Sequence, residues 1–313
     1  MKANGITTAN AVSVGGYHAC ALLADGGVQC WGLDDVGQIA DPGLTYSSVP
    51  IPVALSDKAT AVSAGHAHTC AVLTTGAVAC WGAGEDGQLG DGNGVESDSP
   101  VFVSGIENAI GVSAGAYHTC AWLGDGSVQC WGSNVAGELG NGSTTRSLVP
   151  VTVDSTNFDS SGIAAVSAGW EFTCALQRDG AVLCWGRDGG TLGTGLPLQS
   201  QSVPVLVPLS AAATSISAGA NDACAVLAGT RVVQCWGDNS YGAIGNGTAA
   251  LGSIEPSPTY VTALDTVTAV TVGGAHVCAI SPKAASCWGY NINGQLGDAS
   301  NSDSWVPATV HFF

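Results

Sequence analysis

The sequence predicts an all-β fold, a β-propeller of six four-stranded antiparallel blades. Three observations predict it: a cysteine-marked repeat that occurs six times, short strand-like runs inside each repeat, and a composition poor in helix-forming residues. Glycine accounts for 45 of 313 residues, and charged residues make up only 10% of the chain. Such a composition leaves little material for amphipathic helices, whereas a hydrophobic fraction of 46% is sufficient for a core.

The repeat is visible in the cysteines, which fall in six close pairs whose first members are 50, 50, 54, 50 and 54 residues apart. The third copy reads GVSAGAYHTCAWLGDGSVQCWG and continues into a Gly-rich segment and a proline-led apolar run. Each copy therefore offers four short runs separated by turn residues, which is typical of a propeller blade. A β-solenoid is the alternative, although its coils are usually shorter. The copies span approximately residues 11–53, 61–103, 111–153, 165–207, 215–261 and 269–310, and we expect residues 1–313 to form one domain.

The cysteines of each pair are predicted to face each other across a hairpin. In the first four copies they flank a loop of the type Ala24-Asp25-Gly26, and in the last two copies two-residue loops at Gly229-Thr230 and Pro282-Lys283 preserve the opposition. Opposed residues lie about 4.5–5.5 Å apart at Cα, which is within disulfide range. We therefore expect six disulfides and an oxidising, exported environment, with buried thiols in a cytosolic protein as the alternative. The expected pairs are Cys20–Cys30, Cys70–Cys80, Cys120–Cys130, Cys174–Cys184, Cys224–Cys235 and Cys278–Cys287.

The motifs AGxxHTCAL, DGxVxxWG and NxxGQLG, which recur in this order over residues 11–310, resemble those of the regulator of chromosome condensation repeat family. The resemblance implies a β-propeller in which each repeat supplies most of a blade. It also implies that His18, His68, His118 and His276, two residues before the first cysteine of a copy, pack and hydrogen-bond between strands. A ring of metal-binding histidines is the alternative. By their place in every copy, Trp31, Trp81, Trp131, Trp185, Trp236 and Trp288 are expected to anchor the core.

Charge and motif content exclude several function classes. The chain has 7 Lys and Arg against 24 Asp and Glu, a net charge of −17, so no basic patch for nucleic acid is expected. No apolar run is long enough to span a membrane, and the start of the chain lacks the apolar stretch of a signal peptide. Gly111-Val112-Ser113-Ala114-Gly115 matches a nucleophile elbow, but serine occupies this place in most copies. We therefore expect no enzymatic activity, no cofactor, no metal site and no small-molecule ligand.

A binding face is predicted from the path of the chain. Because strand direction alternates in a meander, the loop after V-S-A-G and the loop after C-W-G emerge at the same end of a blade. Both loops vary between copies and collect aromatic and acidic side chains, a composition suited to protein recognition. The candidate contact residues are Tyr17, His66, Tyr117, Trp170, Glu171, Asp34, Asp35, Glu85, Asp86, Asp188, Tyr241 and Tyr290.

Two functions follow as hypotheses. The first is an extracellular or cell-surface, disulfide-stapled module that binds a protein partner or mediates adhesion without catalysis. The second is a structural subunit that self-associates into an extracellular fibre or surface layer, with the terminal aromatics Phe312 and Phe313 docking on a neighbour. An enzyme of unknown type is a third, less favoured alternative.

Overall fold

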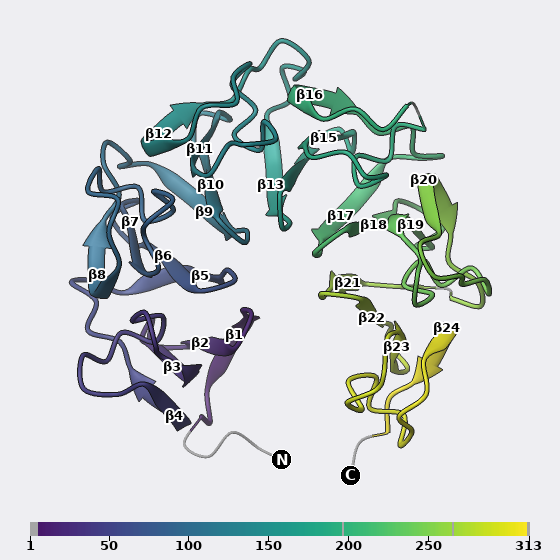
Figure 1. The fold of residues 1–313 in the computed structure, drawn as a ribbon, viewed down its shortest axis with the longest axis horizontal. Coiled ribbons are helices and arrows are strands. Elements are labelled where there is room, and N and C mark those ends of the chain that lie inside the picture. The colour runs from purple at the N-terminus through teal and green to yellow at the C-terminus, as the bar shows by residue number, and fades with distance from the viewer. Residues whose placement is uncertain (1–5, 196, 265, 312–313) are drawn as a thin grey trace. The chain divides into compact units, whose positions relative to one another are not determined.

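The structure is a computed structural model that describes residues 6–195, 197–264 and 266–311 (Figure 1). These residues form strands, turns and irregular segments, with no helix among them. The strands pair into six four-stranded antiparallel sheets, so the predicted six-bladed β-propeller fold is confirmed. The chain divides into two compact units, residues 1–154 and 155–313, with three blades each. The expectation of a single domain stays a prediction, and Phe312 and Phe313 lie outside the described residues.

Within each blade the four strands pair in chain order, as a meander requires. The blades of the first unit contain β1 (Ala9–Val14), β2 (His18–Leu23), β3 (Val28–Leu33) and β4 (Tyr46–Pro52); β5 (Ala59–Ala64), β6 (His68–Leu73), β7 (Val78–Gly82) and β8 (Ser97–Phe102); and β9 (Ala109–Ala114), β10 (His118–Leu123), β11 (Val128–Gly132) and β12 (Ser147–Thr152).

The second unit repeats this arrangement. Its blades contain β13 (Ile163–Ala168), β14 (Phe172–Gln177), β15 (Val182–Gly186) and β16 (Gln201–Leu206); β17 (Ala213–Ala218), β18 (Asp222–Leu227), β19 (Val233–Asp238) and β20 (Ile254–Tyr260); and β21 (Ala269–Val272), β22 (His276–Ile280), β23 (Ala285–Gly289) and β24 (Ser304–Thr309).

The first five blades begin two residues earlier than the sequence predicted. In the first blade Ala9 pairs with Leu23 and Ala11 pairs with Leu22. Between these pairs β1 advances by two residues while β2 advances by only one, so β1 contains a bulge. This bulge lets the strand continue past the point where the repeat pattern becomes visible. The sixth blade begins at Ala269, as predicted, and its first strand pairs without a bulge.

All six expected disulfides are present. In every blade the two cysteines are direct register partners, for example Cys20 with Cys30, and each pair is bonded. Their Cα atoms are 4.0–4.1 Å apart, closer than the predicted 4.5–5.5 Å. The Asp-Gly hairpins close as expected, because Gly26 and Gly180 adopt φ values of +85° and +93°, a region that favours glycine. The predicted two-residue loop at Gly229-Thr230 in the fifth hairpin was wrong. Leu227 N donates a hydrogen bond to Val232 O, which leaves a loop of four residues between them.

The core lies between neighbouring blades of a unit. The Cys20–Cys30 disulfide is fully buried in a cluster with Trp81 of the following blade, and the same arrangement joins Cys224–Cys235 to Trp288. Trp81 donates its indole N–H to the backbone oxygen of Gln38 at 3.1 Å. Five of the six repeat tryptophans are fully buried, as expected, whereas Trp31 is half-buried. These two disulfides thus stiffen the sheet surface against which the next blade of the same unit packs.

Candidate protein-binding face

The two variable loops of each blade lie at the same end of the sheet and are joined by a backbone hydrogen bond. In the first blade His18 pairs with Gly32, so the loop before β2 lies beside the loop after β3. Leu33 N donates to Tyr17 O at 3.0 Å, and Ser133 N donates to Tyr117 O at 2.8 Å in the third blade. The other blades repeat this bond. We call the surface formed by these loops within each unit the loop face.

Neighbouring blades of a unit are also linked through the first of these loops. Gly16 N donates to Gly65 O, and His66 N to Gly115 O, each at 3.2 Å. In the second unit Trp170 N donates to Gly219 O at the same distance. Because these backbone groups are paired, the loops are held in fixed positions and their side chains are presented on a rigid support.

Beneath the loop face, buried histidines connect adjacent blades. His18 Nε2 lies 2.8 Å from Thr69 Oγ1, and Thr69 Oγ1 donates to Gln38 O at 3.0 Å. Since the threonine hydroxyl gives its one hydrogen to the carbonyl, His18 Nε2 must carry the proton of the bond between them. Burial, followed by the neighbouring His66, lowers the pKa of His18 to about 4. The ring is therefore neutral near pH 7.

His18 and His68 hydrogen-bond between blades, as the family resemblance implied. Burial also lowers the pKa of His68 to about 3 and that of His118 to about 4. Among the residues that the structure describes, no group of three or more His, Cys, Asp or Glu is placed to hold a metal ion. Gly15 and Gly65 are required beside the rings, because a Cβ at either position would lie 2.4–2.5 Å from a histidine Cε1.

The structure brings Tyr17, His66 and Tyr117 together on the loop face of the first unit. The ring centroids of Tyr17 and His66 are 6.0 Å apart, and those of His66 and Tyr117 are 6.1 Å apart. The exposed fractions of the two tyrosines are 71% and 37%. The three rings come from three successive blades, and we call them the aromatic ladder.

The second unit carries separate clusters on its loop face. Tyr241 and Tyr290, from successive blades, have ring centroids 4.8 Å apart in an edge-on arrangement. Trp170 is 41% exposed, and the neighbouring Glu171 forms an ion pair with Arg187 at 2.5 Å. Sequence reasoning named Glu171 but missed the arginine that binds it.

The predicted acidic residues divide into surface and structural groups. Asp35 and Glu85 are exposed, and Asp86 and Asp188 are half-buried. Asp34 was wrongly assigned to the binding face. Its side chain is buried, and its carboxylate accepts hydrogen bonds from Ile39 N at 2.8 Å and Asp41 N at 3.3 Å.

Asp34 organises the loop after β3, and an asparagine at the same position organises the equivalent loop in three other blades. Leu139 N donates to Asn134 Oδ1 at 2.9 Å, and Leu296 N donates to Asn291 Oδ1 at 3.0 Å. The signal was present in the sequence, because Asp34, Asn134, Asn239 and Asn291 occupy the same place after C-W-G. Burial raises the pKa of Asp34, against the opposing effect of its two backbone hydrogen bonds.

The sequence profile of the RCC1-like domain matches residues 2–313. This chain belongs to the RCC1-like domain family. The family assignment agrees with the blade architecture, the interblade tryptophans and the H-T-C and C-W-G motifs described above. No helix in the described part of this RCC1-like chain has the length and apolar character needed to cross a membrane.

Known relatives share part of the chain. The Ultraviolet-B receptor UVR8 of Arabidopsis thaliana is 30% identical over 157 residues, which is 48% of this chain and 35% of UVR8. The mitochondrial RCC1 domain-containing protein RUG3 of the same plant is 29% identical over 161 residues, 47% of this chain and 35% of RUG3. The matched region thus spans about a third of the length of each relative.

Solved structures share the fold over almost the whole chain. Human WBSCR16 superposes with a TM-score of 0.87 at 21% identity, covering 98% of this chain and 82% of WBSCR16. Yeast RCC1 (Prp20), solved bound to Kap60, superposes with a TM-score of 0.83 at 20% identity, covering 96% of this chain and 74% of Prp20. At these identities the likeness establishes the fold.

Proposed function

We propose that this RCC1-like chain is an exported, disulfide-stapled module that binds a protein partner or mediates adhesion through its loop face, without catalysing a reaction. The observation that carries the proposal is the aromatic ladder of Tyr17, His66 and Tyr117. Tyrosine and tryptophan are enriched at the centres of protein interfaces, because their rings bury a large area at a small entropic cost. Three such rings, on loops fixed by backbone hydrogen bonds, form a pre-organised contact surface.

The acidic character of the chain supports a protein partner rather than nucleic acid. Asp35 and Glu85 are exposed on the loops that neighbour the aromatic ladder, and the net charge is −17. Such a surface repels phosphate groups. Protein binding is known from the fold, since the structure of Prp20 was solved bound to Kap60. A further Prp20 structure is described together with its binding to Gsp1p and histones.

A non-enzymatic role is supported by the place of the serines that resemble nucleophiles. Ser13 and Ser63 belong to strands, and their Oγ atoms accept hydrogen bonds from Ala64 N and Ala114 N of the following blades at 2.9 and 3.0 Å. Ser113 lies at the equivalent place in β9. Ser13 and Ser63 bind neighbouring blades together, and an exposed strand-to-helix turn, which a nucleophile elbow needs, surrounds neither of them.

The six disulfides support export. Stable disulfides form in oxidising compartments, and every cysteine of the chain is paired. The proposal therefore places the protein outside the cytosol, at the cell surface or in the extracellular medium.

The test is affinity capture from the extracellular and cell-surface proteins of the source organism. Immobilised wild-type protein is compared with the double variant Tyr17→Ala/Tyr117→Ala, which removes two exposed rings without opening the core. We expect a specific partner that the wild type retains and the double variant loses. The matched control is Asp25→Asn/Asp125→Asn in the Asp-Gly turns at the other end of the blades, which should retain the partner. A partner lost equally with both variants, or retained by both, would contradict the proposal.

Self-association is the second candidate, and the exposed surface of β1 favours it. Val12 and Val14 are 58% and 73% exposed, whereas Val112 and Ala114, at the same places in the third blade, are only 6% and 8% exposed. In the third blade Val112 is buried in a cluster with residues of the preceding blade, such as Val72 and Val78. An apolar strand surface of this kind is suited to docking on a second copy of the chain.

Light scattering on a sizing column, without reductant and over a range of concentrations, tests this candidate. Self-association predicts a mass that rises with concentration and falls for the variant Val12→Ser/Val14→Ser. A wild-type particle that stays at 31.0 kDa at every concentration would exclude it for the isolated chain.

A further inference from the structure

Two tyrosines from successive blades of the second unit are in ring contact. Tyr241 lies in the loop after β19, and Tyr290 directly follows β23. Their ring centroids are 4.8 Å apart at an interplanar angle of 64°, near the lower end of the range of about 4.5–7 Å for aromatic pairs. In the part of the chain that the structure describes, no other two tyrosines are in ring contact, since Tyr17 and Tyr117 each contact His66.

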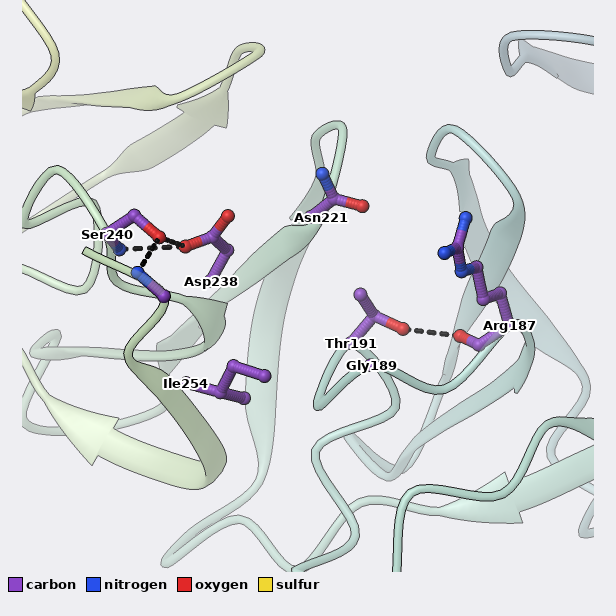
Figure 2. Close-up of a pocket in the computed structure, with 8 residues that line it drawn as sticks. Arg187, Gly189, Thr191, Asn221, Asp238, Ser240 and Ile254 are labelled. Carbon is purple, nitrogen blue, oxygen red and sulfur yellow. Dashed lines mark hydrogen bonds between the residues drawn. The ribbon is translucent and has the colours of Figure 1, made fainter.

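Both tyrosines are attached to backbone that is held by hydrogen bonds. Ser240, which precedes Tyr241, donates from its N–H to Asp238 Oδ1 at 2.7 Å, and Figure 2 shows this bond at the start of the loop. On the other side of the contact, Tyr290 N donates to Ala275 O at 2.9 Å. Paired backbone groups of this kind keep a loop in one position.

The two blades are hydrogen-bonded to each other close to this contact. Trp288 donates its indole N–H to Ala243 O at 2.8 Å, and both residues are buried. This bond lies two residues from each tyrosine along the chain. The loop is joined to the sixth blade again where Gly247 N donates to Trp305 O at 3.0 Å. The backbones of the two tyrosines are therefore held at a fixed separation.

The disulfides leave this contact between blades without a covalent bond. Each of the six disulfides lies within one blade, and no cysteine is left to link two blades. Tyr241 is 39% exposed and Tyr290 is half-buried. The pair is thus open to an oxidant in solution.

We propose that Tyr241 and Tyr290 are an oxidative modification site, at which a peroxidase and hydrogen peroxide join the fifth and sixth blades through a dityrosine bond. Each phenol loses one electron and its hydroxyl proton, and the two phenoxyl radicals combine through ring carbons ortho to their oxygens. The hydrogen on each bonding carbon then moves to the oxygen, which restores both phenols. The chain loses two hydrogen atoms in total, and these reduce one hydrogen peroxide to two waters.

The coupling requires little movement of the chain. The centroids of two directly bonded aromatic rings lie only a fraction of an ångström closer than the 4.8 Å observed here. Rotation about the Cβ–Cγ bond, whose torsional preference is broad, turns the ortho carbons without displacing the ring centroid. Because the two rings are already held together, their coupling is favoured over coupling between separate chains. The inference goes beyond the proposed function, because this modification requires no binding partner at the loop face.

Oxidation of the full disulfide-bonded chain by a haem peroxidase and one equivalent of hydrogen peroxide tests the proposal. The disulfides are then reduced, and trypsin cleaves after Arg231 and Lys283, which places the two tyrosines on separate peptides, 232–283 and 284–313. We expect a joined peptide pair whose mass is two hydrogens below the sum of the two peptides. Denaturing electrophoresis should show that the bond forms within a single chain of 31.0 kDa.

Tyrosine-to-phenylalanine variants assign the crosslink to its residues. Tyr241→Phe and Tyr290→Phe keep a ring in place and remove the hydroxyl, so each should abolish the joined pair. Tyr260→Phe is the matched control, because Tyr260 is 52% exposed and lies on the same tryptic peptide as Tyr241. This control variant should form the joined pair in the wild-type yield.

Thermal unfolding establishes that each variant is folded. Oxidation of the wild type in urea, which separates the rings, should lose the joined pair and provides the test if a variant does not fold. The proposal would be overturned if the folded wild type yields no joined pair, if the pair forms equally well in urea, or if either phenylalanine variant at positions 241 and 290 retains it. Protein capture by the ladder variant is a separate measurement, so the two proposals fail independently.

Discussion

His68 Nε2 donates a hydrogen bond to Thr119 Oγ1 at 2.8 Å, and the two residues belong to adjacent blades. Thr119 Oγ1 in turn donates to Gln88 O at 2.9 Å. The same pair of bonds joins His18, Thr69 and Gln38 one blade earlier. The histidine of one blade and the threonine of the next are therefore coupled through this hydrogen bond.

The sequence of the second unit agrees with this coupling, because the two positions change together. Phe172 replaces the histidine of the fourth blade, and Ala223 replaces the threonine of the fifth. Asp222 then replaces the next histidine, and Val277 the next threonine. Asp222 is buried with its Oδ2 unpaired, and burial, followed by the nearby Asp238, raises the pKa of Asp222 well above its usual range.

Replacing Thr119 by valine should lower the free energy of unfolding by about 1–3 kcal/mol, because the buried His68 Nε2–H loses its acceptor while the volume of the side chain is kept. Urea unfolding measures the effect. Thr144→Val, at an exposed loop position, is the matched control and should change the unfolding free energy by less than about 0.5 kcal/mol. Equal effects from the two variants would refute the assigned role of the hydrogen bond.

Acid should destabilise the protein through the buried histidines. Below pH 6.5 each histidine takes up a proton in the unfolded chain but stays neutral in the folded protein until the pH reaches its folded pKa. That pKa is about 4 for His18 and about 3 for His68. The free energy of unfolding therefore falls as the pH decreases from 6.5 towards these values. The contribution of His18 alone is about 3 kcal/mol over this range. Asp222 acts in the opposite direction, because its raised pKa stabilises the folded state at low pH and this stabilisation is lost as pH rises through the folded pKa.

Urea unfolding at a series of pH values checks this sign. The variant His18→Phe introduces the residue type that Phe172 supplies at the same place in the fourth blade, and it should lose less stability than the wild type between pH 6.5 and pH 4. Parallel curves for the two proteins would show that His18 does not contribute to the acid response.

The disulfides should be complete and stabilising. Without reductant, alkylation followed by mass spectrometry should modify none of the 12 cysteines, and after unfolding and reduction it should modify all of them. Cys120→Ala/Cys130→Ala should lower the unfolding free energy by about 2–3 kcal/mol, because the bridge closes a short loop. Alkylation of the native chain without reductant would argue against the proposed export.

Asp34 should be replaceable by asparagine and not by alanine. Asp34→Asn supplies the Oδ1 acceptor that Asn134 provides in the third blade and should change the unfolding free energy by less than about 0.5 kcal/mol. Asp34→Ala leaves the buried N–H of Ile39 without its side-chain acceptor and should lower the unfolding free energy by about 1–3 kcal/mol. Chemical unfolding of the two variants side by side provides the measurement, and equal losses would show that the acceptor is unimportant.

The repeat made the fold predictable. The number of copies predicts the number of blades, and the constant placement of the cysteines about each turn predicts the register of β2 against β3. The bulge at Ala9 and Ala11 was not predictable, because it lies outside the part of the repeat that is alike in every copy. The widened loop after Leu227 was missed because Arg231 adopts a positive φ of 54°, which its residue type does not suggest.

Site residues were predictable where they follow from the direction of the strands. The grouping of Tyr17 with Tyr117 follows from their equivalent places in the repeat. The burial of Asp34 was missed because loop acids were treated alike, without comparing each repeat position across copies. The small pocket lined by Arg187, Thr191 and Asp238 (Figure 2) depends on a loop one residue shorter than its neighbours and on the contact of two blades, so it became evident only from the packed structure.

The most direct test of the central claim, that the loop face binds a protein partner, is site-specific photo-crosslinking in the extracellular fraction of the source organism. A photoreactive phenylalanine analogue is placed at Tyr17 on the aromatic ladder or at Thr75 in the turn at the other end of the second blade. The account predicts a crosslinked partner from position 17 and none from position 75. A partner crosslinked only from position 75 would contradict it.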